Sequence, residues 1–222
     1  MPGSTPPYQP LLSQLWTPLV AVTASWNGHA SGQIAVSAHG ASIVPDRPRI
    51  LVQLYKRNLT HDLVRDSEAF ALHLLGENQL DIAHLLGFVS GRSFDKLSEV
   101  PHHRGETGSP ILEECLGHVE CRVINAMDGG DMTCFLADVV AGALRGDKNA
   151  SPLRPLWWHQ MRGHMPDEWQ REWDAKMEAE LAFSEPLFDR IDRTSWRPAN
   201  RHNKPNPPDT LSRPGDGSSF RA

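Results

Sequence analysis

Turn signals divide the chain between Pro18 and Gly142 into six short apolar runs, and this division restricts the possible folds more than any other feature. The runs PLVAVTAS and GQIAVSAH flank Asn27-Gly28, and an Asn-Gly pair between two such runs is a strong signal for a tight β-hairpin. HVECRVINAM and MTCFLADVVAG are joined in the same way through DGGD at residues 128–131. With RILVQLY and AFALHLL between these pairs, the sequence predicts six β-strands.

Two helical patterns interrupt the strands, and both are short. One runs from Leu59 to Ser67 and the other from Gln79 to Leu86, each with apolar residues on one side. Parallel strands would need a long crossover between every pair, usually a helix. The pattern therefore favours a closed antiparallel barrel over a set of βαβ units.

The chain changes character beyond Gly142, where a longer helix is predicted to begin with Pro166. Proline is favoured at the first helical position, and two acidic residues follow it in the first turn. Within this helix an apolar residue recurs at every fourth position, which gives a stripe of Trp169, Trp173, Met177 and Leu181. We interpret the stripe as a surface that packs on the barrel or on a second subunit.

These patterns divide the chain into four segments. They are an N-terminal arm (1–16), a barrel domain (17–145), a helical extension (146–193) and a tail (194–222). The tail is rich in proline and glycine and nearly lacks apolar residues, so it cannot bury enough surface to offset its ordering entropy. We predict that it is disordered alone or strapped across a partner subunit.

Bulk properties exclude several classes of protein. The net charge of −5 argues against nucleic acid as the main partner, because phosphate-binding surfaces are basic. No apolar run approaches the length that spans a bilayer, and the start of the chain lacks the pattern of a signal peptide. Three cysteines, Cys115, Cys121 and Cys134, form no disulfide framework. We therefore expect a soluble cytoplasmic protein.

Common catalytic motifs are missing from the sequence. It contains no G-x-G-x-x-G or P-loop, no G-x-S-x-G elbow and no H-E-x-x-H. Cys115, His118 and Cys121 are close enough in sequence to suggest a metal, but strand alternation puts His118 on the opposite face. A fourth ligand is also missing, so we predict no metal site. No pair of carboxylates indicates acid–base hydrolysis.

The stretch YKRNLTHDLV carries the strongest local signal of a ligand. Lys56 and Arg57 stand just before a helix start, where the positive end of the helix dipole repels cations unless an anion is present. Asn58 is placed to cap the helix, Thr60 offers a hydroxyl and Lys56 supplies charge, while Arg57 is expected to face solvent. We predict an anion site here; an ordinary N-cap is the alternative.

From Thr17 to Gly142 the sequence resembles the flavin reductase-like family, whose fold is the FMN-binding split barrel. Three segments carry the resemblance in order: TPLVAVTASWNGHASGQIAVSAHGAS, PDRPRILVQLYKRNLTHDLV and AFALHLLGENQLDIAHLLGFVSGRSFDKL. The resemblance implies a six-stranded antiparallel Greek-key split barrel that forms a homodimer. It also implies FMN as cofactor, with FAD as second choice, and hydride transfer from NADH or NADPH. The reduced flavin would then pass to a separate monooxygenase.

The resemblance also implies which residues bind the cofactor, and it requires no catalytic acid–base pair. The flavin phosphate would lie at Lys56, Asn58, Leu59 and Thr60. The ribityl chain and ring edge would lie beside Gly32, Gln33, Ile34 and Ser37, and the ring would face Ala41 and Ser42. Arg92, after Gly91, would reach a flavin or nicotinamide phosphate; a surface salt bridge to Asp95 is the alternative.

Two other functions remain open from the sequence. The first is an electron carrier that keeps its flavin, which covering of the flavin by the tryptophan-rich helix would favour. The second is a haem protein with the same barrel, in which an axial ligand would be His39, His61, His73 or His84.

Overall fold

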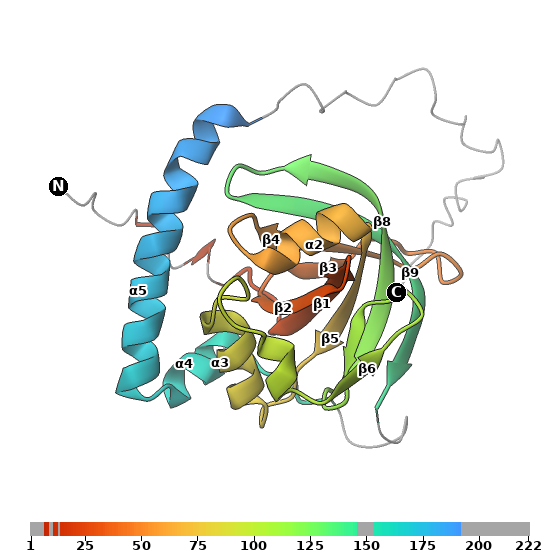
Figure 1. Ribbon diagram of the computed structural model, residues 1–222, viewed down its shortest axis with the longest axis horizontal. Coiled ribbons are helices and arrows are strands. Elements are labelled where there is room, and N and C mark those ends of the chain that lie inside the picture. The colour runs from red at the N-terminus through yellow and green to blue at the C-terminus, as the bar shows by residue number, and fades with distance from the viewer. Residues whose placement is uncertain (1–6, 9–10, 13, 146–152, 192–222) are drawn as a thin grey trace, which may run out of the picture. The chain divides into compact units, whose positions relative to one another are not determined.

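The computed structural model describes residues 7–8, 11–12, 14–145 and 153–191. Its centre is a curled antiparallel sheet of seven strands in the order β2-β1-β5-β8-β9-β4-β3 (Figure 1). The strands are β1 (Val20–Trp26), β2 (His29–Ala35), β3 (Ala38–Gly40), β4 (Arg49–Tyr55), β5 (Ala69–Leu74), β8 (Gly117–Asp128) and β9 (Met132–Leu144). A separate hairpin pairs β6 (His102–Arg104) with β7 (Pro110–Leu112).

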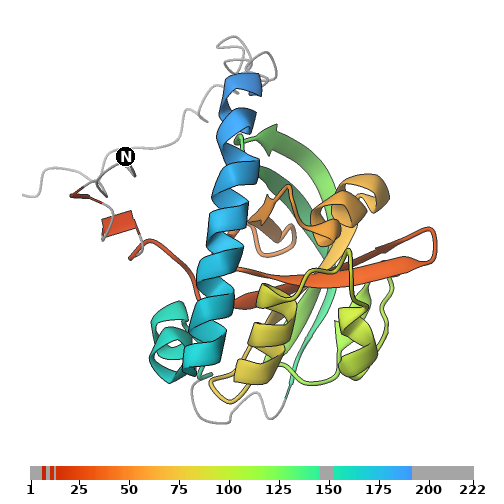
Figure 2. The same ribbon diagram turned by 60° about the vertical axis from the view of Figure 1, so that its left-hand side comes forward.

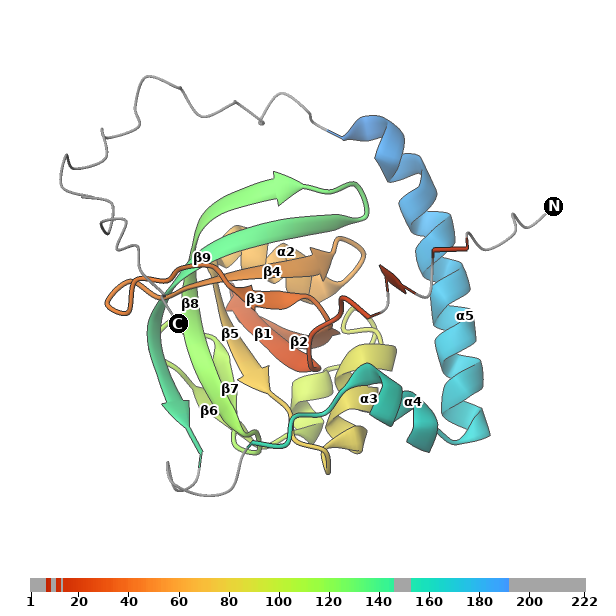
Figure 3. The same cartoon turned by 180° about the vertical axis from the view of Figure 1, so that it is seen from behind.

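The sheet curls because one segment of chain serves both of its edges. β2 pairs with β1 as far as Ala35, and after two residues β3 pairs with β4 from Ala38 onward. At the crossing, Val36 accepts a hydrogen bond from the Thr17 N–H, while Ser37 accepts one from Gln53 in β4. Figure 3 shows β2, β3 and β4 lying together at this closure.

Side chains of β1 alternate between two apolar cores. Val20, Val22 and Ala24 point to a cluster that includes Leu63 and Val64 of α2 (Leu59–Ser67). Leu19 and Ala21 belong to a second cluster with α3 (Leu80–Phe88) and with the segment that holds α4 (Trp158–His164). The sheet thus separates α2 from α3, as period-two alternation requires.

Helix α5 (Asp167–Ser184) runs along one side of this unit and continues into a 3₁₀ turn at Glu185–Arg190. Near its start, Trp169 stacks on His84 of α3 with ring centroids 3.9 Å apart, and Trp173 packs against Phe88. Beyond its end, Phe188 lies against Gly130 in the β8–β9 turn. Figure 2 shows the helix passing in front of the strands.

The predicted fold class is confirmed: the chain is mainly β, with a curled antiparallel sheet of the split-barrel type. The strand count differs, because GQIAVSAH divides into β2 and β3 where the chain crosses between partners. The short strands β6 and β7 carry no repeating pattern and were not predicted. The helix at Leu59–Ser67 has the predicted bounds, and α5 begins one residue after Pro166, which holds its N-cap position.

The apolar stripe of α5 has a mixed environment. Its two tryptophans pack on α3, whereas Leu181 is 67% exposed. No helix among the described residues is long and apolar enough to cross a membrane. The predicted tail, 194–222, lies outside the described residues, and the four segment boundaries stay predictions.

Candidate functional site

The turn between β4 and α2 has the geometry of an anion site. Asn58 holds the N-cap position of α2 with an extended backbone, but its side chain makes no capping hydrogen bond. The first N–H groups of a helix have no partner within the helix, and together with the dipole they attract negative charge. Because Asn58 leaves them uncapped, this helix start is suited to bind an anion.

A pocket of about 270 Å³ opens at this helix start. Three separate parts of the chain line it: the β4–α2 turn, the loop that follows α3, and α5. Its lining residues are Arg57, Asn58, Phe88, Ser90, Arg92, Lys176, Ala179 and Glu180. Figure 1 shows α5 on the side of the molecule to which the β4–α2 turn points.

The pocket carries three cations and one carboxylate. Arg57 lies 3.6 Å and Lys176 lies 3.9 Å from the same oxygen of Glu180. Glu180 is only 4% exposed, and its other carboxylate oxygen has no hydrogen-bond partner. Burial lowers the pKa of Lys176, although the Glu180 charge opposes this effect. The pocket therefore has cationic charge that its single carboxylate does not balance.

Arg92 lines the pocket, and its side chain is tied to α2. Its Nε donates to the Arg57 carbonyl at 3.1 Å, and its Nη2 donates to Asp62 at 2.6 Å. Burial alone would raise the pKa of Asp62, yet hydrogen bonds from Arg92 and His61 hold it below its usual value. Asp95, the alternative partner, instead accepts a hydrogen bond from the Leu97 N–H at the start of a 3₁₀ turn.

The two adjacent cations differ from expectation in which one lines the pocket, although the Arg57 side chain is the more exposed, at 39% against 21% for Lys56. Lys56 donates to Asp128 of the β8–β9 turn at 2.5 Å, and it does not line the pocket. Arg57, which was expected to face solvent, does line it. These residues lie in a turn, where strand alternation no longer determines which side chain points inward.

The predicted residues of β2 divide between its two faces. Gly32 and Ile34 pack against Leu86 and Gly87 of α3, so Gly32 serves helix packing. Gln33 is on the other face, buried, and neither polar atom of its side chain has a hydrogen-bond partner.

Ser31 shares that face of β2 with Gln33, and its hydroxyl is also buried without a partner. Gly91 lies directly over it, because a Cβ on Gly91 would collide with the Ser31 hydroxyl. Buried polar atoms are almost always satisfied in proteins. The unpaired groups of Ser31 and Gln33 therefore fit a polar ligand, such as the hydroxylated chain of a flavin.

The structure does not bring Ala41 and Ser42 to this pocket. The Ala41 N–H donates to the Arg49 carbonyl at 2.8 Å, and the Ser42 hydroxyl accepts from Val44. Arg49 begins β4 whereas the pocket lies beyond its last residue, Tyr55, so the strand separates the two places by about 20 Å. Ser37 lies between them, opposite Gln53.

Leu59 and Thr60 open α2. Leu59 packs on the first core cluster, and Thr60 is buried at 1% exposure. The residues that sequence reasoning missed are Lys176 and Glu180. They lie about 120 residues away in the chain, and the only available signal was that both are charged residues on a helix with a defined apolar stripe.

Three of the four histidines considered as haem ligands are engaged elsewhere. His73 is fully buried, its Nδ1 is 3.2 Å from the Ala21 carbonyl, and its Nε2 accepts from the Leu112 N–H. Burial lowers the pKa of His73 to about 4, so it is neutral. His61 contacts Asp62 and Thr133 through its two ring nitrogens, and His84 contacts Glu172. His39 is exposed in β3.

The curled antiparallel sheet places the chain among proteins with a split-barrel fold. Residues 12–165 match the family described as "Flavin reductase like domain". The chain belongs to this family, as its sequence predicts.

Three relatives with assigned names are similar to this chain in sequence. The chain is 30% identical over 153 residues to a high molecular weight rubredoxin of Moorella thermoacetica, covering 67% of this chain and 64% of that protein. It is 33% identical to the reductase component of a 4-nitrophenol monooxygenase from Rhodococcus opacus, over 64% of this chain and 71% of the relative. It is also 30% identical to a ferric-chelate reductase (NAD(P)H) of Archaeoglobus fulgidus, over 65% and 84%.

A solved structure of an FMN-binding protein from Thermus thermophilus has a similar fold. The TM-score is 0.55 at 28% identity, and the match covers 65% of this chain and 77% of the other.

The buried side chain of Lys96 should make the stability of the fold depend on pH. It is 4% exposed and donates to the Leu86 carbonyl, and burial together with the nearby Lys176 lowers its pKa to about 7. Between that pH and about 10 the unfolded chain binds a proton that the folded chain lacks, so the free energy of unfolding should rise with pH. This group alone should contribute a slope of about 1.4 kcal/mol per pH unit.

We expect Lys96→Met to remove that contribution. In urea unfolding at pH 7.5, 8 and 8.5, the free energy of unfolding of the unmodified protein should rise relative to that of the variant as pH rises. The comparison cancels other titrating groups, such as the buried cysteines. Parallel pH profiles would mean that Lys96 keeps an ordinary pKa.

Proposed function

We propose that this chain is a flavin-binding oxidoreductase that reduces FMN with NADH or NADPH. The observation that carries the proposal is the pocket at the uncapped start of α2, in which Arg57, Arg92 and Lys176 surround the helix N-terminus. The family to which the chain belongs and the reductases among its relatives support the reaction class.

The charge of the pocket supports FMN over FAD. FMN ends in a phosphate monoester, which carries between one and two negative charges at neutral pH, whereas the two phosphates of FAD are joined by an anhydride bond and carry one charge each. The pocket has three cations against Glu180, with the Arg92 charge shared with Asp62. A terminal phosphate also has three free oxygens to accept hydrogen bonds from these cations and from the N–H groups of α2, and on this ground we favour FMN.

The chain's own part in the reaction is binding and orientation. When bound, the flavin supplies the ring that accepts a hydride. Arg57 and the N–H groups of α2 would hold the phosphate, while Gln33 and Ser31 would offer hydrogen bonds to the hydroxylated chain. These contacts would fix one end of the cofactor.

We also propose that the reduced flavin is consumed by a separate monooxygenase, since one relative is the reductase component of such a system.

The three cysteines are free and buried, which supports a reducing, cytoplasmic location. Fractionation of cells that express a tagged chain checks the location, and recovery in an oxidising compartment would contradict it.

Replacing Lys56 and Arg57 separately by alanine tests where the flavin phosphate binds. Arg57→Ala should weaken FMN binding by about 10- to 100-fold, because it removes a charge-assisted hydrogen bond of about 1.5–3 kcal/mol. Lys56→Ala is the matched control and should change FMN affinity less than about threefold, since Lys56 pairs with Asp128. Fluorescence quenching measures both, with riboflavin as the ligand that lacks a phosphate. A larger loss for Lys56→Ala would move the phosphate to the other side of the turn.

Anaerobic reduction separates the reductase from the electron carrier. The tryptophans of α5 pack on α3 and do not line the pocket, although Lys176, Ala179 and Glu180 of the same helix do. We expect NADH or NADPH to bleach the bound flavin near 450 nm in a stopped-flow experiment. With excess FMN and oxygen, turnover should reach about 1–10³ per second. Failure of both nucleotides, with rapid reduction by a protein donor, would support the carrier.

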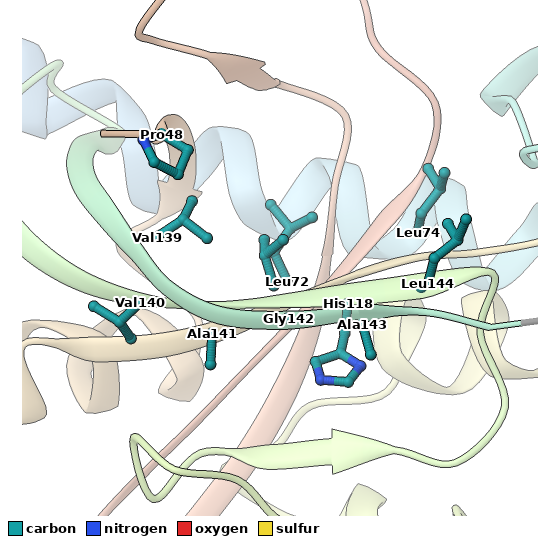
Figure 4. Close-up of a pocket in the computed structure, with 12 residues that line it drawn as sticks. Pro48, Leu72, Leu74, His118, Val139, Val140, Ala141, Gly142, Ala143 and Leu144 are labelled. Atoms are coloured by element: carbon teal, nitrogen blue, oxygen red, sulfur yellow. The ribbon is translucent and has the colours of Figure 1, made fainter. Parts of the chain in front are cut away.

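A homodimer is the assembly we propose, because β8 and β9 present apolar surface to solvent. Ile124, Met127, Val140 and Leu144 are each about half exposed. Val140 and Leu144 also line a hollow of about 600 Å³, whose other lining residues are mostly apolar residues of β5, β8 and β9. Figure 4 shows Leu72, Leu74 and Val139 on one side of the strand pair and Val140 on the other. Exposed apolar surface of this kind marks protein interfaces.

Sedimentation equilibrium tests this assembly at micromolar concentrations. The unmodified chain should sediment as a dimer, and Val140→Glu should shift it to the monomer by placing a charge in the apolar surface. Leu153→Glu, an equally exposed position on the connection into α4, should leave the dimer intact. A monomeric unmodified chain would reject the proposal.

A further inference from the structure

The Glu180 carboxylate occupies the pocket in a poorly satisfied state. It is almost fully buried, its two ion-pair distances of 3.6 and 3.9 Å exceed hydrogen-bond length, and one oxygen has no partner. A buried charge without good partners is costly, because its lost hydration is not replaced. Such a group calls for an explanation beyond stability.

Its position supplies that explanation. Glu180 lies in the same pocket as Arg57, Lys176 and the uncapped start of α2, which is where a ligand phosphate would bind. A carboxylate is itself an anion that a helix N-terminus attracts. Within about 270 Å³ a phosphate and a carboxylate would share the same cations and repel each other.

The helix that carries Glu180 is anchored on both sides of it. Trp169 stacks on His84 and Trp173 packs on Phe88 before it, and Phe188 lies against Gly130 after it. The backbone at position 180 is therefore held over the pocket, and entry of a phosphate requires the side chain to turn away. Because the family match ends at residue 165, this contact belongs to the part of the chain outside that match.

We infer that Glu180 is an internal anion that competes with the flavin phosphate and thereby sets how tightly the phosphorylated cofactor is held. This inference rests on the proposed function. Its consequence is selective: the carboxylate opposes a ligand with a phosphate and is indifferent to the same ligand without one. Because the carboxylate weakens its binding, the flavin exchanges with free flavin as a substrate does. It does not remain bound as a permanent cofactor.

The isosteric variant Glu180→Gln tests the competition, because it removes the charge and keeps the shape. We expect its affinity for FMN to rise about tenfold or more and its affinity for riboflavin to change less than twofold. The release of FMN, followed by fluorescence after dilution, should slow by a similar factor. Glu178→Gln, an exposed carboxylate on the same helix, is the matched control and should leave all three values unchanged.

Other outcomes overturn the inference in distinct ways. Unchanged FMN affinity in Glu180→Gln would mean that the carboxylate does not compete. Weaker binding of FMN and riboflavin alike would mean that Glu180 is a contact for the hydroxylated chain. If neither the unmodified chain nor the variants bind any flavin, the proposed function fails. In that case inorganic phosphate tests whether Glu180 competes with an anion. Phosphate should raise the melting temperature of Glu180→Gln more than that of the unmodified chain. Equal shifts in the two proteins would reject the competition.

Discussion

The crossing of the chain from β2 to β3 is the constraint on which the rest of the structure depends. Val36 and Ser37 satisfy hydrogen bonds from Thr17 on one side and Gln53 on the other, so a single segment joins the two edges of the sheet. Without this crossing the sheet would stay open and β4 would lie far from β2. With it, the end of β4 meets the helix layer near β2, and the uncapped start of α2 faces a loop and a helix instead of bulk solvent.

The parts of the fold that the sequence predicted are those with a repeating local pattern. The hairpin at Asn27-Gly28 has both of these residues at positive φ, as its turn type requires, and α2 has the bounds that its amphipathic pattern indicated. The crossing at Val36–Ser37 could not be predicted, because alternation continues through it while the pairing partner changes. Strands of three residues, such as β6, are too short to show a period.

Only the local part of the candidate site could be predicted from the sequence. The cations before a helix start indicated an anion, and the resemblance to the family placed a phosphate there. Which of Lys56 and Arg57 faces the pocket depends on Asp128, a residue of another hairpin that only the folded structure brings close. The contribution of α5 to the pocket could not be predicted either. Lys176 and Glu180 lie on the polar side of this helix, and the local sequence does not show which residues pack against that side.

The balance of charge in the pocket connects the fold to the kind of chemistry that the chain performs. A protein that keeps a flavin gains from every cation and donor it places around the phosphate. A protein that passes reduced flavin to another enzyme must release it, and tight binding then slows each cycle. Arg57, Lys176 and the start of α2 favour capture, and the Glu180 carboxylate, fixed by the packing of α5 on α3, opposes it. Glu180 lines the proposed phosphate site and Gln33 does not, so the carboxylate would weaken retention while leaving the hydrogen-bonding groups of β2 unchanged. Affinity and orientation would then be controlled by different elements, which is the arrangement expected of a site that treats its flavin as a substrate.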